Sequence, residues 1–80
     1  MPKVTIYSTP TCHYCSSTKT LLNEMDVPFI EYNVAADIEK RKEMMERSGG
    51  RTVPVIAVND QLFVGLDNFK KALDMGLRIR

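Results

Sequence analysis

The 80-residue sequence has no tryptophan, one histidine and only two cysteines, Cys12 and Cys15. Two cysteines are too few for a disulfide scaffold, which needs several along the chain. A structural zinc site needs four ligands. The chain offers only three such ligands close together, Cys12, His13 and Cys15. A zinc site would therefore need a dimer in which both subunits contribute ligands. Covalent haem attachment is excluded because Ser16, not histidine, follows the second cysteine.

The sequence also lacks an excess of either charge and any long apolar run. Eleven Lys and Arg balance ten Asp and Glu, for a formal charge of +1. This balance excludes the basic footprint of a dedicated nucleic-acid-binding protein. The longest apolar run, residues 53–58, is too short to span a membrane, and no apolar signal segment follows Met1. We therefore expect a cytoplasmic protein that binds neither nucleic acid nor membranes.

The remaining composition is that of a folded protein, with 44% hydrophobic and 26% charged residues. We expect one domain over residues 1–80. Apolar periodicity and turn residues predict strands over residues 3–8, 29–34, 53–58 and 61–64, and helices over 16–25, 38–47 and from Asp67 to about Gly76. The expected N-caps of these helices are Thr11, Asp37 and Asp67.

The predicted order is β-α-β-α-β-β-α. A strand, a helix and a second strand at the start require a parallel pair with a right-handed crossover. Two helices can cover one face of a four-stranded mixed sheet and the third helix the other face. This pattern predicts an α/β fold built as a three-layer α/β/α sandwich.

Several motifs in this order resemble the glutaredoxin family. They are Tyr7, Cys12-His13-Tyr14-Cys15, Thr52-Val53-Pro54 and Gly65-Leu66-Asp67, and the resemblance extends from Lys3 to about Gly76. It implies the thioredoxin fold, which agrees with the order of elements predicted from patterning.

The two cysteines are expected to have different roles. A thiolate, not a thiol, attacks a disulfide. Cys12 is predicted in the first turn of a helix, where free backbone N–H groups favour an anion, and a protonated His13 would add a cation. Cys15, one turn later, should be shielded, so we expect Cys12 to attack and Cys15 to resolve the mixed disulfide. Two buried apolar cysteines are the structural alternative, which the polar loop around Thr9 disfavours.

Pro54 lies at the start of a strand that is expected to be central, where a proline has no backbone N–H to donate to the neighbouring strand. A cis bond after Val53 resolves this conflict, and a trans proline at the first position of the strand is the alternative. The resemblance implies a cis-proline facing the cysteines and a Val53 backbone that binds substrate. It also implies glutathione-binding roles for Tyr14, Thr52 and Asp67. Asp67 acting only as a helix cap, and Tyr14 only packing against the core, are the structural alternatives.

The resemblance implies a monomeric, glutathione-dependent thiol–disulfide oxidoreductase that reduces protein disulfides or glutathionylated cysteines and holds no bound cofactor or metal. Three departures weaken the glutathione assignment. His13 replaces the usual proline, and Ser8 stands where many glutaredoxins carry a Lys or Arg that faces the glycyl carboxylate of glutathione. Residues 64–68 also lack one Gly and one Asp of the family pattern. The first alternative is a redoxin that serves ribonucleotide reductase and is reduced by thioredoxin reductase. The second is an iron–sulfur or metal-binding carrier. Lys70 and Lys71 are interpreted as a solvated basic helix face.

Overall fold

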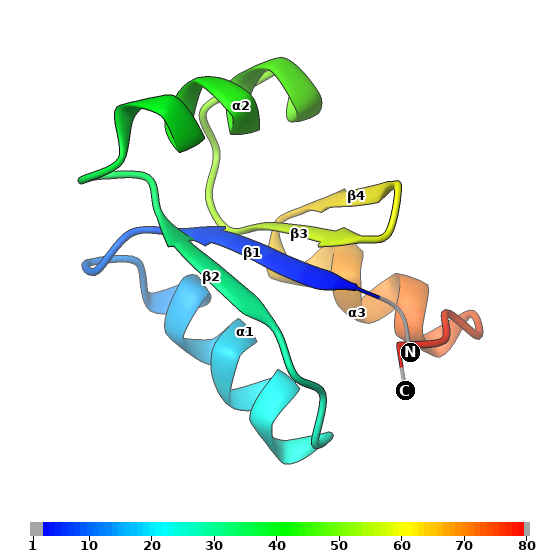
Figure 1. Ribbon diagram of the computed structural model, residues 1–80. Helices are drawn as coiled ribbons and strands as arrows, with labels where there is room; N and C mark the ends of the chain where they lie inside the picture. Colours follow the sequence, from blue (N-terminus) through cyan, green and yellow to red (C-terminus); the bar gives the residue numbers. More distant parts are fainter. Residues whose placement is uncertain (1–2, 80) are drawn as a thin grey trace.

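A computed structural model describes residues 3–79 (Figure 1). The elements, in chain order, are β1 (Val4–Ser8), α1 (His13–Glu24), β2 (Ile30–Asn33), α2 (Ile38–Ser48), β3 (Val55–Val58), β4 (Gln61–Val64) and α3 (Leu66–Asp74). The predicted β-α-β-α-β-β-α order is confirmed. Most boundaries move by one to three residues, and β3 begins at Val55, directly after the cis Val53–Pro54 bond.

The four strands form one mixed sheet in the order β2-β1-β3-β4. β1 pairs with β2 in parallel and with β3 antiparallel, and β3 pairs antiparallel with β4. Tyr7, near the end of β1, faces Val55 at the start of β3. The loop that leaves β1 and the loop that enters β3 therefore meet at the same end of the two central strands, although they are far apart in sequence.

The sheet separates two hydrophobic cores, as alternation along β1 predicts. On one face, Ile6 packs with residues of α1 and α3, including Leu22 and Phe69. On the other, Tyr7 packs with Met44 of α2. Figure 1 shows α1 and α3 on one side of the sheet and α2 on the other, which confirms the predicted three-layer α/β/α sandwich.

The N-cap predicted for the first helix is wrong by one position. Cys12, not Thr11, has the extended backbone of the cap (φ −86°, ψ 115°), and its own side chain accepts a hydrogen bond from the backbone N–H of Cys15. The usual capping side chains accept this hydrogen bond through oxygen, whereas here the sulfur of Cys12 is the acceptor. The Asp37 cap of α2 is confirmed, because its carboxylate accepts the Lys40 N–H at 3.1 Å.

The N-cap predicted for the last helix is also wrong. Gly65 caps α3 with a backbone (φ 88°, ψ 152°) open almost only to glycine, and no side chain caps the helix. This conformation turns the chain directly from β4 into α3, so the helix starts before Asp67. Asp67 instead lies in the first turn, where its negative charge complements the helix dipole. Among residues 3–79, none of the helices has the length and apolar character needed to span a membrane.

Candidate functional site

The two cysteines lie at the N-terminal end of α1, in different environments. Cys12 is partly exposed and its backbone N–H donates to the Thr9 carbonyl at 3.3 Å. Its Sγ accepts the Cys15 backbone N–H at 3.2 Å. Cys15 is fully buried, with 0% exposure. One sulfur is therefore open to a substrate and receives a backbone hydrogen bond, while the other lies beneath it.

The electrostatics of Cys15 reinforce this difference. Burial raises the pKa of the Cys15 thiol to about 12, and its hydrogen bond with Cys12 acts in the same direction. A backbone hydrogen bond at Thr9 and the charge of Lys19 oppose the rise only in part. Cys15 therefore stays protonated at neutral pH and does not compete with Cys12 as a nucleophile. Both thiols are free in this structure, as a reduced pair.

The Val53–Pro54 segment closes the site from the far end of the sequence. The Val53–Pro54 peptide bond is cis, as the resemblance to the family implied. The Cys12 Sγ lies 4.0 Å from the Val53 carbonyl oxygen. The Pro54 carbonyl accepts the backbone N–H of Gly65 at 2.8 Å, which ties this segment to the start of α3. Three segments, the CxxC loop, the cis-proline loop and the β4–α3 junction, are thus held together.

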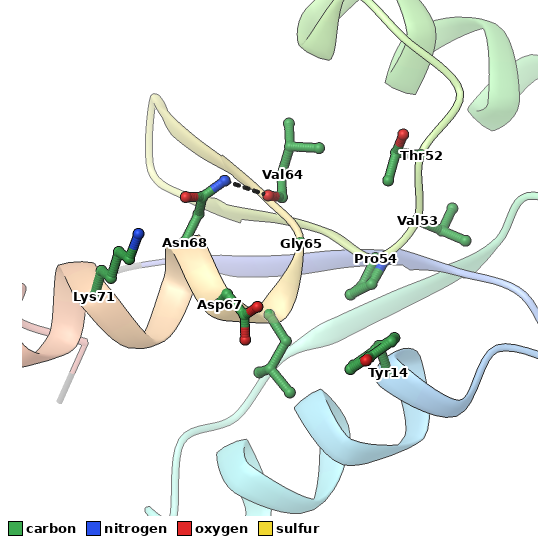
Figure 2. Close-up of a pocket in the computed structure, with 10 residues that line it drawn as sticks. Tyr14, Thr52, Val53, Pro54, Val64, Gly65, Asp67, Asn68 and Lys71 are labelled. Carbon is green, nitrogen blue, oxygen red and sulfur yellow. Dashed lines mark hydrogen bonds between the residues drawn. The ribbon is translucent and has the colours of Figure 1, made fainter.

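A pocket of about 480 Å³ opens between these segments (Figure 2). It is lined by Tyr14, Thr52, Val53, Pro54, Val64, Gly65, Leu66, Asp67, Asn68 and Lys71. Tyr14 is 60% exposed and presents its ring to solvent beside the pocket. The side-chain amide of Asn68 donates to the Val64 carbonyl at 2.7 Å, so this group already has one protein partner.

The structure brings together all seven residues that the sequence singled out. Tyr14, Thr52, Val53, Pro54 and Asp67 line the pocket. Cys12 stands at its edge, beside the Val53 carbonyl, and Cys15 is buried beneath Cys12.

Sequence reasoning missed Lys71, which lines the pocket and which it interpreted as part of a solvated face. A signal was present for Lys71. It follows Asp67 by four positions, and residues with this spacing lie on the same side of a helix.

Within residues 3–79, no group of three or more His, Cys, Asp or Glu side chains is placed to hold a metal ion. The two thiols and the open pocket fit exchange between sulfur atoms.

Comparison with known proteins identifies the family. A sequence model of the glutaredoxin family matches residues 4–63. An uncharacterised glutaredoxin-like 8.6 kDa protein in the rubredoxin operon of Clostridium pasteurianum is 41% identical over 64 residues, which are 80% of this chain and 85% of that protein. Glutaredoxin 3 of Escherichia coli strain K12 is 41% identical over 68 residues, which are 85% of this chain and 82% of that protein. A buckwheat glutaredoxin–glutathione complex superposes with a TM-score of 0.81 at 19% identity, covering 94% of this chain and 71% of that chain. The chain therefore belongs to the glutaredoxin family of thiol–disulfide oxidoreductases.

Proposed function

We propose that the protein is a glutathione-dependent thiol–disulfide oxidoreductase, acting as a single-domain monomer on protein disulfides or glutathionylated cysteines. One observation carries the proposal. Cys12 is the partly exposed cap of α1 with a hydrogen-bonded sulfur, beside an open pocket, and Cys15 is buried and protonated below it.

The first step is attack by Cys12. The Cys15 N–H hydrogen bond and the N-terminal end of α1 stabilise negative charge on the Cys12 sulfur. With a glutathionylated protein, this thiolate attacks the glutathione sulfur. A bond forms between Cys12 and glutathione, the old disulfide breaks, and the departing protein thiolate takes a proton from water.

The second step regenerates the enzyme by one of two routes. A second glutathione thiolate can attack the glutathione sulfur bound to Cys12, which yields glutathione disulfide and the free Cys12 thiolate. For a protein disulfide, Cys15 loses its proton and attacks the Cys12 sulfur, which releases the reduced protein and oxidises the pair. Two molecules of glutathione then reduce the Cys12–Cys15 disulfide, which balances the two electrons.

The pocket supplies the binding surface for glutathione. Within the described chain, the Val53 N–H donates to no other backbone group, so it is free to pair with the extended backbone of a peptide. Tyr14 offers an exposed ring and a hydroxyl at the pocket, Thr52 and Pro54 line its wall, and Asp67 offers a carboxylate. The buckwheat relative, which was solved as a complex with glutathione, supports this assignment.

The test is a glutathione-coupled disulfide reduction assay with two matched serine variants. Cys12→Ser should abolish the reduction of both glutathionylated peptides and protein disulfides. Cys15→Ser should lose protein disulfide reduction but keep deglutathionylation, which needs only Cys12. Wild-type turnover by Cys12→Ser would refute the proposal.

A second candidate function is reduction by thioredoxin reductase, as in the redoxins that serve ribonucleotide reductase. The start of α3 favours this function, because one acidic residue of the family's glutathione-binding pattern is missing there. Asn68 follows Asp67 in its place, and the Asn68 side-chain amide donates a hydrogen bond to the Val64 carbonyl. Measuring how fast glutathione and thioredoxin reductase each reduce the oxidised protein separates the two. A large preference for thioredoxin reductase would favour this second function.

A further inference from the structure

A second pocket, of about 530 Å³, is lined by Lys3, Thr5, Arg47, Ala57, Asn59 and Asp60. Figure 1 shows the start of β1 and the β3–β4 turn at one end of the sheet, and the loop between β1 and α1 at the other end. The pocket is thus separate from the cysteines, and the proposed reaction does not use it. Its volume falls in the range of small-molecule sites, about 300–1,000 Å³, and far exceeds that of a single phosphate ion.

The floor of this pocket is a pair of facing residues, Thr5 on β1 and Ala57 on β3. Because side chains alternate along a strand, Thr5 lies on the same face of β1 as Tyr7, which packs against α2. Thr5 is 7% exposed, and its hydroxyl makes no hydrogen bond within residues 3–79. In that part of the chain, no fully enclosed side-chain oxygen or nitrogen lacks a partner, so solvent reaches this hydroxyl through the pocket.

Arg47, near the end of α2, forms one wall, and its guanidinium is held in place. Its Nη1 donates to the hydroxyl of the buried Tyr7 at 2.9 Å. Tyr7 stands two positions from Thr5 on the same face of β1, so the guanidinium lies beside the floor of the pocket. A guanidinium has five N–H donors, and within the described residues only this one is bonded. The others are available to a ligand.

The β3–β4 turn supplies another wall through Asn59. Its backbone N–H donates to the Lys3 carbonyl at 2.8 Å, and its Oδ1 accepts the Lys3 backbone N–H at 3.0 Å. Because the amide oxygen is occupied, the amide nitrogen of Asn59 remains to donate. Lys3 adds a second positive charge to the pocket and Asp60 one negative charge. None of the ion pairs within residues 3–79 uses Arg47 or either of these two.

We propose that this pocket binds a small sugar phosphate, with the phosphate at Arg47 and Thr5 and a sugar hydroxyl at Asp60. A phosphate monoester carries close to two negative charges at neutral pH, and an arginine can bind it through two parallel hydrogen bonds. Two cations against one carboxylate leave the pocket positive, and Asn59 adds a neutral donor. The carboxylate of Asp60 repels a second anionic group but accepts hydrogen bonds from hydroxyls. This combination favours a phosphate joined to a polyol over a free phosphate ion.

The experiment follows the backbone amide signals of the reduced protein by NMR during titration with ribose 5-phosphate, inorganic phosphate or ribose. Ribose 5-phosphate should shift the signals of Thr5, Asn59 and Asp60 in a saturable manner. It should bind at least about threefold more tightly than inorganic phosphate, as expected for one added hydrogen bond. Ribose alone should cause no saturable shift, because it lacks the charged group.

Three variants test the individual side chains. Arg47→Gln should weaken the binding of ribose 5-phosphate at least about fivefold, because it removes charge-assisted hydrogen bonds. Arg41→Gln is the matched control. Arg41 is exposed, on the same helix and outside the pocket, so this variant should bind as wild type. Thr5→Val keeps the shape of the side chain and the bond between Arg47 and Tyr7, and it should weaken binding about two- to fivefold.

Three results would overturn the inference. The first is the absence of saturable shifts at Thr5 and Asn59 with ribose 5-phosphate. The second is equal weakening by Arg47→Gln and Arg41→Gln, which would mean that only the overall charge of the protein acts. The third is equal affinity for inorganic phosphate and ribose 5-phosphate, because the sugar would then gain nothing from Asp60. None of these results involves the cysteines, so the proposed function is tested separately.

Discussion

The Sγ of Cys12 lies 4.0 Å from the carbonyl oxygen of Val53, although 41 positions separate the two residues in the chain. The antiparallel pairing of β1 with β3 produces this proximity, because the end of one strand meets the start of the other. The partly exposed sulfur of Cys12 therefore lies beside the backbone of Val53.

The first prediction concerns alkylation of the two cysteines. At pH 7, iodoacetamide should modify Cys12 at least a hundredfold faster than Cys15, because Cys15 is buried and its pKa is raised to about 12. Peptide mass spectrometry after timed quenching measures both rates.

Single-cysteine variants provide the control. Cys15→Ser should leave the modification rate of Cys12 within about threefold of wild type, since the Cys15 backbone N–H that bonds to Cys12 is retained. Cys12→Ser should leave Cys15 nearly unreactive. Rapid modification of Cys15 in the folded Cys12→Ser protein would contradict the structure.

The second prediction concerns the backbone at Gly65. Gly65→Ala should destabilise the protein by about 1–3 kcal/mol, because φ 88° with ψ 152° is a conformation that alanine avoids. A Cβ there would meet nothing within 4 Å, so the cost comes from the backbone and not from a clash. Urea unfolding measures the free energy of unfolding.

Gly50→Ala is the matched change, because Gly50 has no positive φ and an added Cβ there also meets open space. It should be neutral or slightly stabilising, by less than about 1 kcal/mol. Equal losses in the two variants would show that the conformation of Gly65 is not what matters.

The order of elements could be predicted because local signals agree with it. Pro28, the Ser48-Gly49-Gly50 run and the Asn59-Asp60 turn separate the apolar segments, and the cap at Asp37 forms as its residue type suggests. These features depend on a few neighbouring residues. They therefore appear in the sequence before any tertiary contact is known.

The details that sequence reasoning missed depend on tertiary structure or on unusual chemistry. Cys12 caps α1 through sulfur, a role that cap preferences for Ser, Thr, Asp and Asn do not anticipate. α3 starts before Asp67 because Gly65 turns the chain into the helix, and its N–H donates to the Pro54 carbonyl across the β3–β4 hairpin. The spacing of Lys71 from Asp67 indicates that both lie on one side of α3, but only the structure shows that this side lines the pocket.

The third prediction concerns Tyr7, which is 1% exposed. Its hydroxyl donates to Glu43 at 2.8 Å and accepts from Arg47 at 2.9 Å, which joins β1 to α2. Tyr7→Phe should lower the free energy of unfolding by about 1–2 kcal/mol, since both charged partners lose a hydrogen bond. The shift of the urea midpoint measures it.

Tyr32→Phe is the control for this variant. Tyr32 is half-buried beside Tyr7, with ring centroids 5.7 Å apart, and its hydroxyl makes no hydrogen bond within residues 3–79. Its loss should change stability by less than about 0.5 kcal/mol. A Tyr7→Phe protein as stable as Tyr32→Phe would show that the link to α2 contributes nothing measurable.

The last prediction concerns stability in acid. Hydrogen bonds from Lys19 at 2.8 Å and from the buried Ser8 at 2.6 Å lower the pKa of Glu31 in the folded protein. The unfolded chain binds the proton more readily, so this stabilisation is present above the ordinary glutamate pKa of about 4.3 and is lost as the pH falls through the lower folded value. Glu31→Gln should therefore reduce the free energy of unfolding at pH 7 and flatten the decline of that free energy between about pH 5 and pH 3.

Urea unfolding at several pH values measures this, with Glu39→Gln, at an exposed position of α2, as the control. An acid decline as steep in Glu31→Gln as in Glu39→Gln would show that Glu31 is not the group whose protonation weakens the fold.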